Sequence, residues 1–353
     1  NGEIGGNAVV KIIQSLADVE ALQIQEDRRF FSAEHDEIAS AATTDIYFVK
    51  TQEMLKQMGL EEAVVVAEIF ARRAGVFAGS PEVKSLLASA NVEVECLLEG
   101  AEFAEKEVVM RIIGRYADFG VFETAILGML ASSSGWATAA RKISDAAAGS
   151  PVTIFGARHV HPAIAPVMER AAVVGGVGGS SCILGAKLVG KAPSGTTPHA
   201  FFLLVGDTVE GAKAYNQLLP PESARIILVD TFKDEVEESL RVAAALGRDL
   251  EGIRLDTPSE RGGVTPGLVQ ELRAKLDMAG YSNVKIFVSG GLTPERLQIL
   301  KQAGADAFGV GSYISGASAI DMTMDLKEVN GKPVAKRGRI PGSWPNPRHI
   351  KLL

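Results

Sequence analysis

The sequence predicts an α/β protein that combines a closed or nearly closed parallel α/β barrel with a separate α+β domain. From residue 151 to 318, short apolar strands alternate with amphipathic helices, an order typical of a parallel sheet covered by helices. Residues 1–150 instead mix strand and helix patterns. The segment 322–335 alternates apolar and polar residues around Asn330-Gly331, which predicts an antiparallel hairpin. We therefore expect residues 319–353 to return to the N-terminal domain.

The composition is that of an ordinary globular protein large enough for two domains, with 353 residues, 46% hydrophobic and 22% charged. A net charge of −7 argues against a general nucleic-acid binder, because phosphate backbones require a basic surface. Cys96 and Cys182 lie far apart, so no disulfide framework or cysteine-rich zinc site is predicted, and a reducing cytoplasm fits. No apolar run reaches the length of a membrane span, and the N-terminus lacks the order of a signal peptide.

Elements of the first half follow from β-branched content and helix-start signals. Ser80-Pro81 predicts a helix with Ser80 as its cap and Pro81 in its first turn. Residues 122–148 read as two helices that meet at a break over 132–135. Three runs predict strands: 63–70, 92–97 and 108–113.

Elements of the second half are predicted from their alternation. Thr293-Pro294 again places a cap before a first-turn proline. Helices are clearest over 235–246, 266–279 and 294–303. Strands are expected to begin near Val152, Val173, Gly190, Ile226, Ile253, Val284 and Ala307.

Two glycine-rich turns end the last two predicted barrel strands. Ser289-Gly290-Gly291 and Gly309-Val310-Gly311-Ser312 would lie side by side at the carboxyl ends of the strands, where barrels gather their sites. Exposed backbone N–H groups there can cradle a phosphate. A single turn of this kind would only reverse the chain, but the pair predicts phosphate binding.

Charged residues end two further strands. Arg254 and Asp256 are two apart on one strand, so their side chains point to the same side and could bind a diphosphate and a ribose hydroxyl. An internal salt bridge is the alternative. Asp230 ends the preceding strand and could hold Mg²⁺ through water or cap a helix. No metal centre built from protein ligands alone is predicted.

His199 follows the turn Gly195-Thr196-Thr197-Pro198 and precedes an apolar stretch. A neutral imidazole can take a phosphoryl group as well as a proton. The alternative is a histidine that packs or starts a helix. The glycine-rich anion sites and the strand-end acids elsewhere in the chain favour the functional interpretation.

Six segments, taken in order, resemble nicotinate phosphoribosyltransferase over residues 40 to 340. They are 44–48, 155–162, 195–200, 254–258, 289–293 and 308–312. The resemblance implies a type II phosphoribosyltransferase fold, with an irregular parallel α/β barrel and an α+β sandwich domain, working as a head-to-tail homodimer or higher oligomer with shared sites. It implies that nicotinate, phosphoribosyl pyrophosphate and ATP react with Mg²⁺ in a ligase-type step of NAD biosynthesis, with His199 as a phosphohistidine.

The resemblance also implies roles for individual residues. Phe155 and Tyr47 of the partner subunit would stack on the two faces of the pyridine ring, although by composition both could be core residues. Arg158 would hold a phosphate or carboxylate, and Ser180, in a loop without an acid, would favour nicotinate over its amide. The remaining contacts to phosphoribosyl pyrophosphate would come from Thr196, Asp230, Arg254, Asp256, Gly290, Gly291, Gly311 and Ser312.

Two rival interpretations remain. A quinolinate phosphoribosyltransferase shares the barrel, decarboxylates a dicarboxylate and needs no ATP, but its site calls for extra basic residues around the base. A non-catalytic sensor on the same barrel would bind phosphoribosyl pyrophosphate without turnover. His199 and the modest basic content of the loops favour the nicotinate enzyme.

Overall fold

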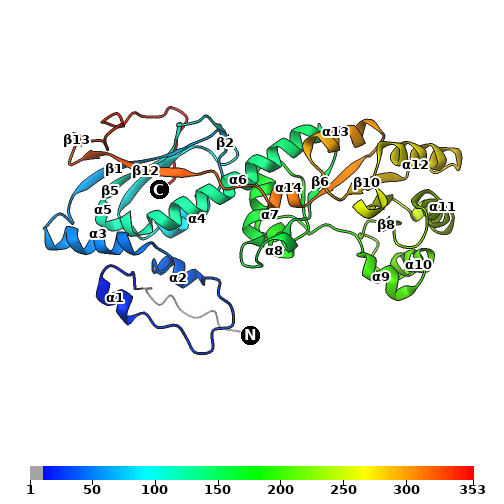
Figure 1. The fold of residues 1–353 in the computed structure, drawn as a ribbon, viewed down its shortest axis with the longest axis horizontal. Helices are drawn as coiled ribbons and strands as arrows, with labels where there is room; N and C mark the ends of the chain where they lie inside the picture. Colours follow the sequence, from blue (N-terminus) through cyan, green and yellow to red (C-terminus); the bar gives the residue numbers. More distant parts are fainter. Residues whose placement is uncertain (1–10) are drawn as a thin grey trace. The chain divides into compact units, whose positions relative to one another are not determined.

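The computed structural model describes residues 11–353, which divide into two compact units (Figure 1). The first contains the chain up to Gly135 together with Ala319–Leu353, and the second contains Trp136–Ser318. The first has an antiparallel sheet and the second a parallel sheet, so the predicted mixed α/β class is confirmed.

The first unit is built on a six-stranded sheet. Its strands are, in sheet order, β13 (Lys332–Pro333), β12 (Met322–Val329), β1 (Val64–Ala71), β5 (Val108–Arg115), β3 (Val92–Cys96) and β14 (Ile350–Lys351). A separate pair joins β2 (Gly75–Val76) to β4 (Glu102–Phe103). The predicted hairpin is confirmed, because β12 pairs antiparallel with β13 and its turn residues Asn330 and Gly331 both have positive φ, 49° and 74°.

The helices of the first unit correct two predictions. Gly79 rather than Ser80 caps α4, and α6 is continuous over 25 residues instead of breaking at 132–135. The small residues there make room for a neighbouring segment. A Cβ on Gly79 would lie 2.6 Å from the Met129 carbonyl oxygen, and Ala78 N–H donates to Ser134 Oγ at 3.1 Å. The helices are α1 (Leu16–Ala21), α2 (His35–Ala39), α3 (Ile46–Gln57), α4 (Ser80–Leu86), α5 (Tyr116–Phe119) and the first half of α6 (Glu123–Ala147).

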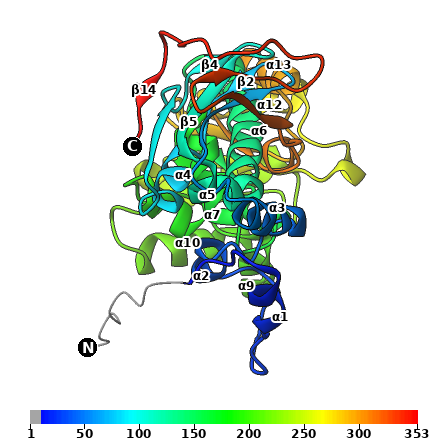
Figure 2. The ribbon, with the colours of Figure 1, turned by 90° about the vertical axis from the view of Figure 1, so that its left-hand side faces the viewer.

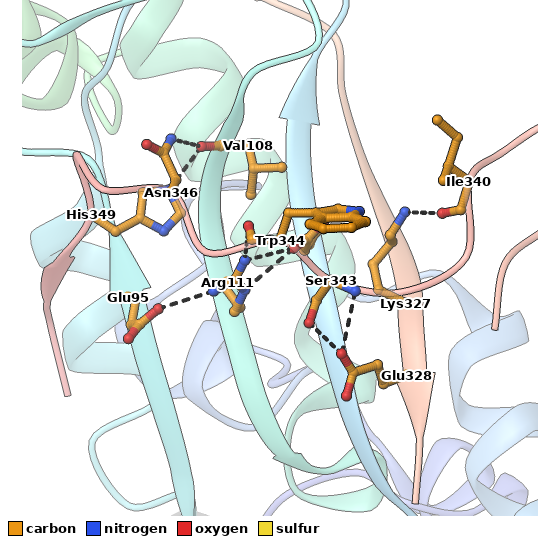
Figure 3. A network of polar contacts seen from close by, with 11 residues as sticks. Glu95, Val108, Arg111, Lys327, Glu328, Ile340, Ser343, Trp344, Asn346 and His349 are labelled. Carbon is orange, nitrogen blue, oxygen red and sulfur yellow. Dashed lines mark hydrogen bonds and ion pairs between the residues drawn. The ribbon is translucent and has the colours of Figure 1, made fainter. Parts of the chain in front are cut away.

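The C-terminal segment lies across this sheet, and β14 forms one of its edges (Figures 2 and 3). Arg111 on β5 is paired with Glu68 at 2.8 Å and also donates to the Trp344 carbonyl oxygen. Nε2 of His349 lies 2.8 Å from the Val108 carbonyl oxygen. These contacts tie the end of the chain to strands that are more than 200 residues earlier in the sequence.

The second unit contains a parallel sheet that carries the glycine-rich turns. Its strands are, in order, β7 (Gly179–Ser180), β6 (Val152–Ile154), β11 (Ala307–Val310), β10 (Lys285–Ser289), β9 (Gly252–Leu255) and β8 (Ile226–Leu228). Within residues 11–353 the end strands β7 and β8 do not pair with each other, so the barrel is irregular rather than closed. Because the strands are parallel, their carboxyl ends meet at one edge.

Two predicted strand starts in this unit are wrong. Val173 lies in the helix α7, whose buried alanine and methionine side chains pack against the core, and Gly190, with φ of 69°, follows α8. The predicted helix over 235–246 is confirmed as α11, and Thr293 caps α13 by accepting from Arg296 N–H. The helices are α7 (Ala165–Val174), α8 (Ile183–Leu188), α9 (His199–Val205), α10 (Thr208–Leu218), α11 (Glu235–Leu246), α12 (Pro266–Met278), α13 (Pro294–Gln302) and α14 (Ser312–Ser315).

Candidate functional site

Arg254 is the centre of a polar network at the carboxyl ends of β9 and β10. Its Nε donates to Ser289 Oγ at 2.9 Å and its Nη1 to Thr196 Oγ1 at 2.8 Å. Asp256 Oδ2 lies 3.4 Å from Nη2, and Ser289 Oγ donates to Asp256 Oδ1 at 2.7 Å. The structure therefore brings Arg254, Asp256 and Thr196 together, with the internal salt bridge also present. Ser289 stood in the first predicted glycine-rich turn, but the sequence assigned it no role of its own; its place at a strand end beside two glycines is the signal that could have given it one.

Burial and charge act on Arg254 in opposite directions. Its side chain is only 14% exposed, and this burial lowers the pKa of the guanidinium. The carboxylates of Asp256 and Asp230 oppose the shift, whereas the charge of Arg158 adds to it. Two cations thus act on one another in this part of the unit, an arrangement that a bound anion would stabilise.

Phe155 packs beside this network. The Arg254 guanidinium carbon lies 5.2 Å from the Phe155 ring centroid, and Phe155 stacks on Phe287 at 6.0 Å. A Cβ on Gly309 would lie 2.4 Å from Phe155 Cε2. Position 309 must therefore be glycine for the ring to keep its place. Stacking of Phe155 on a substrate base remains a prediction.

The two glycine turns follow the adjacent strands β10 and β11. Gly290 and Gly291 have φ of 93° and 59°, which strongly favours glycine. A Cβ on Gly311 would lie 2.8 Å from His159 Cε1, so that position is limited by space. Ser312 begins the short helix α14. Close backbone approach to a ligand is one of the uses of glycine at such positions.

His159 and Arg158 lie in the turn that follows β6, in the 3-10 segment Ala157–His159. His159 Nδ1 is 2.9 Å from Ser315 Oγ, and this hydroxyl donates to the Gly311 carbonyl oxygen at 3.2 Å. The imidazole is therefore fixed beside the second glycine turn. His159 lies within the segment 155–162, but the sequence assigned it no role, and only the contact with Ser315 identifies it.

His199 and Asp230 form a pair at the carboxyl end of β8. His199 is the first residue of α9, and its Nε2 lies 3.0 Å from Asp230 Oδ2. The Asp230 side chain is 2% exposed and the His199 side chain is 40% exposed. Burial raises the pKa of Asp230, while the hydrogen bond from His199 opposes the rise. Asp230 Oδ1 is buried and lacks a hydrogen-bond partner, and so do Thr197 Oγ1 and Thr231 Oγ1, which belong to residues close in sequence to the pair. Such unsatisfied atoms indicate a place for a ligand or cation.

We expect Asp230→Asn to raise Tm by a few degrees at pH 7, because the amide removes a buried charge while its oxygen can still accept from His199. A raised pKa means that the folded state binds the proton more tightly than the unfolded state, so the carboxylate lowers stability as pH rises. The gain should therefore vanish below pH 3.8, the ordinary value for aspartate, and be complete above the raised pKa. Thermal melts from pH 3.5 to 8 measure it, with Asp145→Asn on an exposed part of α6 as the matched control. An equal gain at every pH would contradict this explanation.

Ser180 and Tyr47 stand apart from this network. Ser180 is buried, and its hydroxyl donates to Glu169 Oε2 at 2.6 Å. Tyr47 lies on α3 of the first unit, and the residue is 56% exposed. Contact of either residue with a substrate remains a prediction. The sequence analysis did not identify Glu169 as a candidate site residue.

No group of three or more histidine, cysteine, aspartate or glutamate side chains within residues 11–353 could hold a metal ion. No helix in the same range is both long enough and apolar enough to cross a membrane.

The chain is similar to known proteins along most of its length. Residues 45–134 match the N-terminal domain and residues 136–325 the C-terminal domain of the quinolinate phosphoribosyl transferase family. A solved nicotinate-nucleotide pyrophosphorylase from Pyrococcus furiosus is 45% identical, with a TM-score of 0.86, over 90% of this chain and 82% of that one. A probable nicotinate-nucleotide pyrophosphorylase (carboxylating) of Bacillus subtilis is 25% identical over 79% of this chain and 89% of its own length.

Nicotinate phosphoribosyltransferases are also among the relatives. One from Mycobacterium tuberculosis is 30% identical over 254 residues, which are 69% of this chain and 55% of that protein. The chain thus spans about half the length of this curated relative.

Proposed function

Because the chain belongs to the quinolinate phosphoribosyltransferase family, we propose that it transfers the phosphoribosyl group of phosphoribosyl pyrophosphate to quinolinate. The products would be nicotinate mononucleotide, pyrophosphate and carbon dioxide. The observation that carries this proposal is the match of both family domains over residues 45–325, supported by the 45% identical archaeal structure.

The nicotinate phosphoribosyltransferase assignment made from the sequence is wrong, since the family matches and the archaeal structure point to the quinolinate enzyme. The six segments mostly surround the phosphoribosyl site, and the two enzymes share that barrel. They therefore predicted the fold and the common substrate rather than the base. Nicotinate and ATP as substrates, the ligase-type coupling and the phosphohistidine at His199 are withdrawn with the assignment, because the quinolinate reaction uses no ATP.

Phosphoribosyl pyrophosphate would occupy the carboxyl ends of β9, β10 and β11. The turns with Gly290 and Gly311 would hold the 5-phosphate through backbone N–H groups, with Gly291 and Ser312 beside them. Arg254 would face the diphosphate and Asp256 the ribose hydroxyls. The reaction passes through an oxocarbenium-like ribose, so fixed charges contribute more than a protein nucleophile.

Quinolinate would lie against Phe155, near the cations Arg158 and Arg254. Two carboxylates need more than one positive partner, and the fixed His159 is a further donor when protonated. Once the ring nitrogen carries the ribose, its positive charge stabilises the electron pair that the departing carbon dioxide leaves at C2, and a proton then adds to that carbon. In this proposal the protein holds the ring and both carboxylates in place.

Mg²⁺ fits the same site, and its donors would be carboxylates with water. Mg²⁺ retains several waters and usually binds one or two carboxylates together with substrate phosphates. Asp230, with its unpartnered buried Oδ1, and Asp256 are the residues that would hold it. The ion would neutralise charge on the diphosphate.

We also propose that the protein forms a homodimer or higher oligomer with shared sites, in which Tyr47 of the partner subunit approaches the base. A cytoplasmic location is proposed as well. Both proposals come from the sequence. Light scattering of the purified chain, with and without phosphoribosyl pyrophosphate, measures the oligomer.

The proposed activity is tested by incubating the full chain with Mg²⁺, phosphoribosyl pyrophosphate and either quinolinate, nicotinate or nicotinamide, each with and without ATP. We expect quinolinate to be consumed with one carbon dioxide per nicotinate mononucleotide and no effect of ATP. Turnover of nicotinate without turnover of quinolinate would overturn the proposal. Tight binding of phosphoribosyl pyrophosphate without turnover of any base would favour the sensor instead.

A further inference from the structure

Glu169 is a fully buried carboxylate that takes no part in the site described so far. It lies on α7 with an exposed fraction of 0%. Four hydrogen bonds reach its two oxygens. Oε1 accepts from Ala157 N–H at 3.1 Å and from Ser181 Oγ at 3.2 Å, and Oε2 accepts from Ser180 Oγ at 2.6 Å and from Cys182 N–H at 2.7 Å.

The four donors belong to two neighbouring loops. Ala157 stands in the turn after β6, between Phe155 and Arg158, while residues 180–182 are at the end of β7 and in the turn after it. Because β6 and β7 pair in parallel, both loops leave the sheet at the same edge. Glu169 therefore joins two loops through its hydrogen bonds. One is the loop after β6, which carries Phe155, and the other is the loop after β7, which begins at Ser180 and which the family resemblance linked to the choice of base.

The loop after β6 and the helix α8 pack closely against α7. A Cβ on Gly156 would lie 2.7 Å from Met168 Cε, and one on Gly185 would lie 3.1 Å from Glu169 Cβ. Glycines on both sides thus let the loops and α8 approach the helix closely. The carboxylate is held at a fixed place between them.

A carboxylate is well suited to accept these four hydrogen bonds. An ionised carboxylate only accepts hydrogen bonds, at about four lone-pair sites, and Glu169 receives four donors. A glutamine has the same shape, but its NH₂ group would face two of these donors. The hydroxyl of Ser180 is one of these four donors, so Ser180 also helps to fix the loop after β7.

We propose that Glu169 is a positioning residue that sets the geometry of the base subsite by joining the loops after β6 and β7. The inference rests on the proposed function only in taking Phe155 and Arg158 as base contacts. The loops after β9, β10 and β11, where phosphoribosyl pyrophosphate would bind, supply none of the four donors. The effect of Glu169 should therefore fall on one substrate and not on the other.

Steady-state kinetics of Glu169→Gln in the full chain test the proposal. We expect KM for the base to rise at least about tenfold, the effect of a displaced charge-assisted contact, with KM for phosphoribosyl pyrophosphate within about twofold. Ser181→Ala removes a single donor and should give a smaller rise in the same KM. Glu271→Gln, on the exposed side of α12, is the matched control and should change neither constant.

An unchanged KM for the base, or equal changes in both constants, would overturn the proposal. If Glu169→Gln does not fold, Ser181→Ala takes its place. The proposal is then overturned if KM for the base is unchanged, or if KM for the base and KM for phosphoribosyl pyrophosphate change equally. The assay uses whichever base the wild type converts. Failure of the wild type with quinolinate therefore counts against the proposed function, while the comparison of variants still tests Glu169.

Discussion

Arg254→Ala is expected to lower kcat/KM about 10³-fold, the loss typical of removing a charge that stabilises a transition state in a largely desolvated site. Arg254 is held from two sides by Ser289 and Thr196 and lies beside Asp256, so its guanidinium is already oriented before substrate binds. This pre-organisation is lost with the side chain. The partly buried Asp256 is also left without its cation.

Arg254→Lys separates charge from geometry. A lysine keeps the positive charge but cannot reproduce both hydrogen bonds of the guanidinium, so most of the loss should remain. The measurement is kcat/KM for phosphoribosyl pyrophosphate. Arg248→Ala, in the exposed turn before β9, is the matched control and should behave as the wild type. A loss below tenfold in Arg254→Ala would show that the diphosphate is bound elsewhere.

Arg111→Ala is expected to destabilise the first unit by about 3–5 kcal/mol, because it leaves a buried carboxylate without its cation. Arg111 and Glu68 have side chains 6% and 5% exposed, and they lie opposite each other on β5 and β1. Arg111 also holds Glu95 at 3.4 Å and the Trp344 carbonyl oxygen, so the C-terminal segment loses an anchor as well (Figure 3).

Urea unfolding followed by circular dichroism measures this loss. The double variant Glu68→Leu/Arg111→Met is the informative control, since replacing a buried ion pair with apolar side chains of similar volume is often nearly neutral. It should be clearly more stable than Arg111→Ala alone. A loss below about 1 kcal/mol in the single variant would mean that water reaches Glu68.

Local signals in the sequence were sufficient to predict many helices, strands and turns correctly. The helix over 235–246 and the turn at Asn330-Gly331 were predicted correctly, because caps, periodicity and positive φ are properties of adjacent residues. The grouping of Arg254, Asp256 and the glycine turns at one sheet edge also followed from strand order, whereas Thr196, which bonds Arg254, was implied only by the family resemblance. Val173 was misjudged, because an apolar run that packs as a helix resembles a buried strand in sequence.

The sequence by itself determined the α/β class, the glycine-rich turns of the proposed phosphoribosyl site and the antiparallel C-terminal hairpin, because each depends on residue types at short spacings. Only the tertiary structure decided that α6 runs unbroken past Ser132–Gly135, where Gly79 packs against it. It alone placed Glu169 under two loops and His159 against Ser315. A buried side chain is selected by all the segments that surround it, and those segments are brought together only by folding.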